Sequence, residues 1–138
     1  MTRTPVQLRA GAALEPRTIG PVTQTDVVRF AGAGGDFNPL HHDAEYARAA
    51  GLPGVIAMGQ MQAGMLASWV SDRVHVENLL SFSVRFASPL FLGDTLELTG
   101  TVESIDSAGV AELDLVATVA DRTVITGHAR VRARASAE

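Results

Sequence analysis

The spacing of the apolar residues changes once, near the middle of the chain, and this change limits the folds that the chain can adopt. Between residues 23 and 72 the chain is rich in Ala, Gly and Met, and its apolar residues recur at helical intervals. Between residues 78 and 133 apolar and polar residues alternate, as they do in strands with one buried face. The sequence therefore predicts an α+β fold, helical in its first half and an antiparallel sheet in its second.

Two short helices are predicted early in the helical half. Thr23 and Asp26 have the spacing of a capping pair, and the helix that they open is expected to end at the glycines of positions 34 and 35. Asp43 is placed to cap a second helix over residues 44–50. The segment between these helices is therefore expected to be a loop.

A long helix is predicted over residues 58–71, and Gly59 and Gly64 within it predict that another group lies close to its backbone. Strands are predicted at residues 80–86, 96–103, 112–119 and 125–131, with a fifth at 17–22. The apolar face of this sheet needs a cover, and the long helix is the element apolar enough to supply it. An antiparallel sheet of about five strands wrapped round a long central helix is the hot-dog fold.

The composition narrows the class of protein. A length of 138 residues without a repeat or long linker predicts a single domain over residues 1–138. The absence of Cys excludes disulfides, thiolate metal sites and a cysteine nucleophile, and it agrees with a reducing compartment, so we expect a cytoplasmic protein. No apolar stretch is long enough for a membrane span, and a net charge of −4 without any Lys argues against a nucleic-acid partner.

The densest group of reactive side chains lies in the predicted loop, in the stretch Gly35-Asp-Phe-Asn-Pro-Leu-His-His-Asp43. Pro39 keeps the preceding residue out of the helical conformation, so the chain can fold Asp36 and His41 toward one point, as paired proton transfer requires. In the alternative interpretation, Asp36 caps a turn and His41 is a surface residue. A metal site is not expected, because the side chains of adjacent histidines diverge and no third spaced ligand follows.

This stretch, followed by Gly59 at the head of the long helix, resembles the hydratase motif of the MaoC-like (R)-specific enoyl-CoA hydratases and 3-hydroxyacyl dehydratases. Ser68-Trp-Val70 and Ser83-Val-Arg-Phe86 also resemble the catalytic subunit of actinobacterial (3R)-hydroxyacyl-ACP dehydratases, so the resemblance covers most of the chain. The resemblance implies a hot-dog fold and the reversible addition of water to a trans-2-enoyl thioester.

The resemblance also implies roles for individual residues. Asp36 and His41 match the catalytic pair that holds the water, and Gly59 matches the glycine whose backbone N–H receives the thioester oxygen. The chain departs from many relatives in having Met58 where they have His, and from some in having Ala67 where they have a Ser that supports the catalytic Asp. Asn38 or Ser68 could take over that support, but for Asn38 the favoured alternative is a structural role in which it orients the loop through its own backbone.

The expected activity is (R)-specific hydration of an enoyl thioester of CoA or acyl carrier protein, or the reverse dehydration, without a metal or redox cofactor. Because hot-dog sheets commonly join edge to edge, a homodimer or a heterodimer with a second hot-dog subunit is expected. A hot-dog thioesterase would need a carboxylate on the central helix, and none occurs between Gly59 and Ser71. A non-catalytic acyl-binding subunit would be expected to have a broken Asp–His pair, which is intact here.

Overall fold

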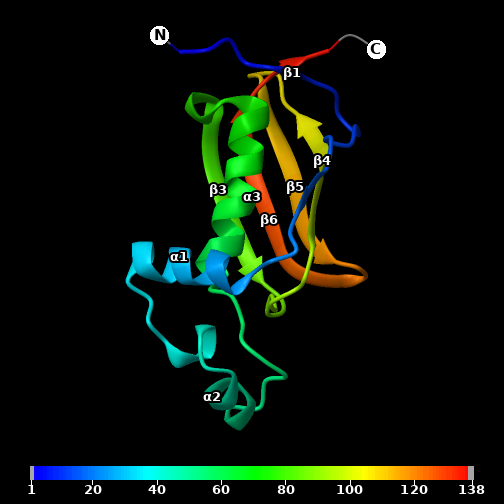
Figure 1. The fold of residues 1–138 in the computed structure, drawn as a ribbon. Helices are drawn as coiled ribbons and strands as arrows, with labels where there is room; N and C mark the ends of the chain where they lie inside the picture. Colours follow the sequence, from blue (N-terminus) through cyan, green and yellow to red (C-terminus); the bar gives the residue numbers. More distant parts are fainter. Residues whose placement is uncertain (1, 137–138) are drawn as a thin grey trace.

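A five-stranded antiparallel sheet curves around one long helix in the computed structural model of the protein, which describes residues 2–136 (Figure 1). The sheet has the strand order β2-β4-β5-β6-β3. Its strands are β2 (Arg17–Ile19), β3 (Leu79–Phe86), β4 (Leu96–Ile105), β5 (Val110–Val119) and β6 (Arg122–Arg132). The predicted hot-dog fold is confirmed, and the predicted fifth strand is present as β2. A further parallel pair, β1 (Gln7–Leu8) with β7 (Arg134–Ala135), was not predicted.

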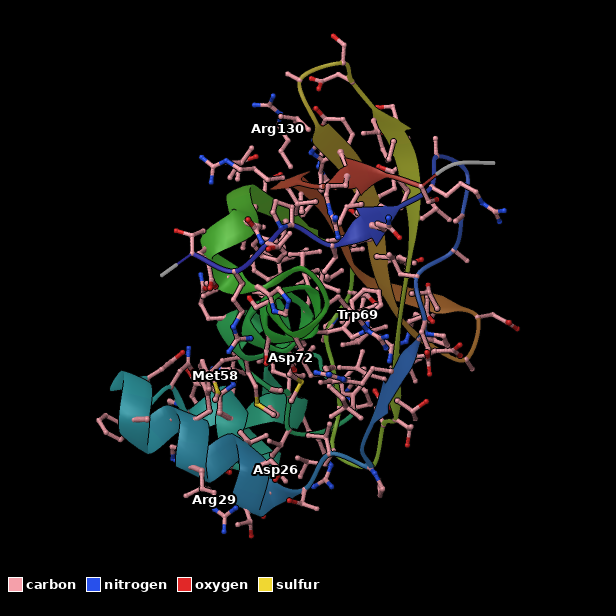
Figure 2. The ribbon with its side chains drawn as sticks, turned by 90° about the horizontal axis from the view of Figure 1, so that it is seen from above. Asp26, Arg29, Met58, Trp69, Asp72 and Arg130 are labelled. Atoms are coloured by element: carbon pink, nitrogen blue, oxygen red, sulfur yellow. The ribbon has the colours of Figure 1, made fainter. Side chains whose placement is uncertain are left out.

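The long helix is α3 (Gly59–Val74), and the core lies between it and the concave face of the sheet. Leu66, Trp69 and Val70 are fully buried, and Trp69 lies on the sheet side of the helix (Figure 2). The indole N–H donates to the carbonyl of Glu15 at 3.2 Å, which gives this buried polar atom a partner. The helix runs three residues beyond the predicted end, so Asp72 also belongs to it.

The two glycines of the central helix differ in their surroundings. A Cβ on Gly59 would lie 2.9 Å from Cε1 of Phe86, so another group does approach this residue closely. No protein atom would lie within 4 Å of a Cβ on Gly64, which instead lines a cavity with Met65 and Ser68. Among residues 2–136, no neighbouring backbone therefore approaches Gly64 as closely as Phe86 approaches Gly59.

The remaining helices are α1 (Gln24–Gly34), η1 (Pro39–His41), α2 (Ala44–Ala49) and η2 (Val76–Asn78). α1 and α2 lie at the end of the molecule where α3 begins, and the two ends of the chain lie at the opposite end (Figure 1). None of the helices in the described part of the chain combines the length and the hydropathy needed to cross a membrane.

The predicted caps of the short helices are confirmed. Thr23 and Asp26 form a capping box, in which the Thr23 N–H donates to Asp26 Oδ2 at 2.9 Å. This N–H holds the pKa of Asp26 below its ordinary value, and the Thr23 hydroxyl lowers the same pKa further. Gly35 ends α1 with a φ of 73°, which glycine adopts without steric cost, and Asp43 caps α2. These caps fix both ends of the loop that carries the reactive residues.

Candidate active site

Asp36 and His41 face one another across the loop between α1 and α2. Asp36 Oδ2 lies 3.4 Å from His41 Nε2. The loop turns sharply between them because Asn38 Oδ1 accepts the Leu40 N–H at 3.0 Å and so begins η1, with Pro39 in its first position. His41 is 7% exposed, so it is not a surface residue, whereas the Asp36 side chain is 48% exposed. The pair therefore lies at the boundary between the protein interior and solvent.

The imidazole of His41 is oriented by a backbone carbonyl. His41 Nδ1 lies 2.8 Å from the carbonyl oxygen of Ile56, and because a carbonyl can only accept, Nδ1 carries the hydrogen. In the neutral ring the lone pair is then on Nε2, the atom that faces Asp36. Two further bonds hold this turn: the Ile56 N–H donates to the Leu40 carbonyl at 3.1 Å, and Gln24 Nε2 donates to the His41 carbonyl at 2.9 Å.

The contributions of Ile56 and Gln24 were not predicted from the sequence. Ile56 acts through its main chain, which every residue type possesses, so its side chain carries no signal. Gln24 is an ordinary polar residue at the start of a helix, and only the folded chain brings its amide to the His41 carbonyl.

The two residues predicted to support Asp36 lie in different places. The Asn38 N–H donates to Asp36 Oδ1 at 3.3 Å, which leaves Oδ2 to face the imidazole. The Asn38 side chain itself caps η1. Ser68 is exposed on α3 and lines a separate cavity of about 620 Å³ together with Met65 and Arg17. Among residues 2–136, no hydrogen bond joins Ser68 to Asp36, so the structure does not bring these two together.

Gly59 is the first residue of α3, and its backbone N–H therefore has no partner within the helix. The helix dipole adds partial positive charge at this end, which favours an anionic oxygen. Gly59 lines a cavity of about 300 Å³ with the buried Gln62, with Phe86 and with the loop that follows β3. Asp36 and His41 do not line this cavity, but Ile56, whose carbonyl orients His41, does. One short segment, residues 55–59, thus carries both the anchor of His41 and the free amide.

In the described part of the chain, one group of His and carboxylate side chains is close enough to share a metal ion. Its ligand atoms, from Glu103, Asp114 and His128, lie within 4.8 Å of one another on β4, β5 and β6. This group belongs to the outer face of the sheet and is not part of the Asp36–His41 site. His128 Nε2 also pairs with Glu112 at 2.9 Å.

Curated relatives of the chain include hydratases and dehydratases. The chain is 29% identical to the (R)-specific enoyl-CoA hydratase of Rhodospirillum rubrum over 113 residues, covering 80% of the chain and 78% of the relative. It is 30% identical to the 3-hydroxybutyryl-CoA dehydratase of Methylorubrum extorquens over 114 residues, covering 80% of the chain and 73% of the relative. One of these relatives is named a hydratase and the other a dehydratase.

Solved structures support the fold. The R-hydratase PhaJ1 of Pseudomonas aeruginosa superposes with a TM-score of 0.81 at 24% identity, covering 96% of this chain and 90% of that one. A chain of the ChsH1-ChsH2 complex of Mycobacterium tuberculosis superposes with a TM-score of 0.80 at 23% identity, covering 91% and 98%. The profile of the family described as "MaoC like domain" matches residues 6–124. Because this match spans most of the chain, the protein belongs to the MaoC-like domain family.

Proposed function

We propose that the protein adds water to trans-2-enoyl thioesters to form (3R)-3-hydroxyacyl thioesters, or catalyses the reverse dehydration. The observation that carries this proposal is the arrangement around residues 55–59, where one segment holds both the carbonyl that anchors the buried imidazole of His41, which faces Asp36, and the unpaired Gly59 amide. The named activities of the hydratase and dehydratase relatives support the same reaction class.

Water would be held beside the pair, within hydrogen-bond reach of both side chains. With Nδ1 of His41 donating to Ile56, neutral Nε2 and the ionised Asp36 carboxylate are both acceptors and face each other at 3.4 Å. A water molecule beside them can donate one hydrogen to each, which points its oxygen lone pair away from both. Such a water is oriented for attack on the β-carbon of a bound enoyl thioester.

The proton and charge movements then balance in one addition. The water oxygen bonds to the β-carbon, one water proton passes to the Asp36–His41 pair, and the electron pair of the double bond moves toward the thioester oxygen. The Gly59 N–H stabilises the resulting enolate oxygen, and the pair returns a proton to the α-carbon. Because both proton transfers use one pair of groups, the addition is syn. Two assignments of base and acid between Asp36 and His41 remain compatible with this scheme.

A thioesterase and a non-catalytic acyl-binding subunit are the competing functions, and each would need different residues. A thioesterase that acts through a helix carboxylate could use only Asp72 of α3, and this residue lies near the far end of the helix, bound to Arg17 at 2.9 Å. An acyl-binding subunit would not need the buried, oriented imidazole that His41 provides. The geometry therefore favours the hydro-lyase.

The test is a direct assay with purified protein. Crotonyl-CoA, longer trans-2-enoyl-CoAs and the corresponding acyl-carrier-protein thioesters are supplied separately, and loss of the conjugated enoyl absorbance is followed. We expect hydration of at least one series, with (3R) product by chiral chromatography and no release of free thiol. Thiol release without hydration would indicate a thioesterase, and binding without turnover would indicate an acyl-binding subunit.

We further propose that the protein works as a dimer, either with itself or with a second hot-dog subunit. β3 is an edge strand of the sheet, and its Leu80 and Phe86 are 40% and 54% exposed. An unpaired edge with exposed apolar side chains is a surface that proteins usually cover. We expect light scattering to give about twice the 14.5 kDa chain mass, and Leu80→Asp to shift it to monomer. A wild-type monomer that is fully active alone would contradict this proposal.

A further inference from the structure

We infer that Arg122, at the start of β6, is a positioning residue that fixes the geometry of His41 and Gly59 without touching either. Its guanidinium holds the loop between β3 and β4, residues 87–95, and that loop is bonded to the segment that carries the site. The expected effect of Arg122 on kcat rests on the proposed function, whereas its expected effect on the hydrogen bond of His41, measured by NMR, does not.

Arg122 contacts the 87–95 loop at several points. Nη1 donates to Ser88 Oγ at 2.8 Å and to the Pro89 carbonyl, Nη2 donates to Asp94 Oδ2 at 2.8 Å, and the guanidinium carbon lies 5.5 Å from the centre of the Phe91 ring. A planar guanidinium can make these contacts at once because its donors form a rigid fork, which the ammonium of Lys does not have. The ion pair is partly shielded from water, since the two side chains are 36% and 22% exposed.

The loop in turn holds residues 55–59. The Ala57 N–H donates to the Leu90 carbonyl at 2.8 Å, and Ile56 forms an isolated antiparallel bridge with Phe91. The Leu90 side chain is fully buried, so this part of the loop is fixed in the core. The position of Ile56 is therefore set by the loop that Arg122 clamps.

Both functional groups depend on that position. The Ile56 carbonyl accepts from His41 Nδ1 at 2.8 Å, and three residues later the chain enters α3 with the Gly59 amide. Ser88 and Pro89 of the clamped loop also line the cavity at Gly59. A shift of the 87–95 loop would therefore move both the Ile56 carbonyl, which orients the imidazole, and the wall of the cavity at Gly59.

The test compares Arg122→Ala with Arg122→Lys and with Arg130→Ala as a matched control. Arg130 pairs with Glu112 at 3.0 Å on another part of the sheet, far from Met58, the residue before Gly59 (Figure 2). We expect Arg122→Ala to lower kcat by between about 10-fold and 100-fold, as small misplacements of reacting groups do, and to change KM less. Arg122→Lys should fall between this variant and the wild type, and Arg130→Ala should match the wild type.

A second readout needs no substrate. In ¹⁵N-histidine NMR, with the His41 signal assigned by its absence in His41→Ala, neutral His41 of the wild type should be the Nδ1–H tautomer. In Arg122→Ala the Nε2–H tautomer should become populated, and the Ala57 amide should exchange with solvent faster. Arg122→Lys provides the same readouts if the Ala variant does not fold.

The outcomes separate this inference from the proposed function. A wild type without hydratase activity would refute the function and leave the NMR comparison to decide on Arg122. Unchanged His41 tautomer and Ala57 exchange in the Arg122 variants would overturn the inference, whether or not kcat falls. Equal effects of Arg122→Ala and Arg130→Ala would also overturn it.

Discussion

Asp36→Asn and His41→Ala are each expected to lower kcat/KM for an enoyl thioester by about 10²-fold to 10⁴-fold, the contribution of a positioned acid–base group. Asn can still accept the Asn38 N–H through its carbonyl oxygen, so the loop is preserved while the carboxylate charge opposite His41 is lost. Ala at position 41 removes the Nε2 atom that faces Asp36. The measurement is steady-state hydration of the best substrate, followed in both reaction directions.

The double variant gives a sharper result than either single one. Because the two side chains hold the same water, their effects should not add, and the Asp36→Asn/His41→Ala protein should be about as slow as the slower single variant. Additive losses would indicate that the two groups act in separate steps. Retention of wild-type activity in either single variant would exclude the proposed mechanism.

Neighbouring residues of the same loop provide matched controls. His42 is exposed and adjacent to His41, so His42→Ala removes an imidazole from the same loop without disturbing the pair. Asp43→Asn keeps the cap of α2, because Asn is as good an N-cap as Asp. Both controls should keep wild-type kcat and wild-type thermal stability.

Gly59→Ala is expected to produce the second large loss, approaching the roughly 10²-fold to 10³-fold that removal of an oxyanion donor costs. The new Cβ would lie 2.9 Å from Cε1 and 3.2 Å from Cδ1 and Cζ of Phe86. The ring must therefore move, and Phe86, which is 54% exposed, has the freedom to move into or across the cavity at the amide. The loss should appear in kcat, because the hydrogen bond to Gly59 strengthens as charge develops on the thioester oxygen.

Gly64→Ala is the matched control, because it adds the same methyl group to the same helix. No atom lies within 4 Å of the new Cβ, so the substitution should leave kcat unchanged. It should also raise the free energy of unfolding by about 1 kcal/mol, the usual difference between Ala and Gly inside a helix. Ala keeps the backbone N–H, so wild-type kcat in Gly59→Ala, or an equal loss in both variants, would contradict the prediction that a methyl group at position 59 disturbs the oxyanion site through Phe86.

The local elements were predicted well because each depends on neighbours in sequence. The Thr23–Asp26 capping box, the end of α1 at Gly35 and the Asp43 cap involve residues no more than a few positions apart. The alternation in the second half likewise identified four strands to within a few residues of their observed ends. The end of α3 was placed too early, because its last turn packs into the core through Val74, which is fully buried.

Exposure along the edge strand was predicted less well. Alternation in residues 80–86 predicts a buried face, yet Leu80 and Phe86 are 40% and 54% exposed. Leu80 lies at a β-bulge, where the register shifts between Leu79 and Ser81, so Leu79 and not Leu80 packs against the core. Phe86 is the last residue of β3, which has a neighbour on one side only, β6. Periodicity reports which residues share a face, whereas coverage of that face depends on the position of the strand in the sheet.

The sequence by itself determined the identity and order of the reactive residues, because Asp36, Pro39 and His41 lie within one turn-forming stretch whose chemistry is local. Only the tertiary structure decided which nitrogen of His41 faces Asp36, that Ser68 lies away from them, and that Phe86 packs on Gly59. These outcomes depend on backbone groups and side chains that are 15 or more residues away along the chain, such as the Ile56 carbonyl. A backbone carbonyl is present in every residue type, so no pattern of side chains can reveal which one will orient an imidazole.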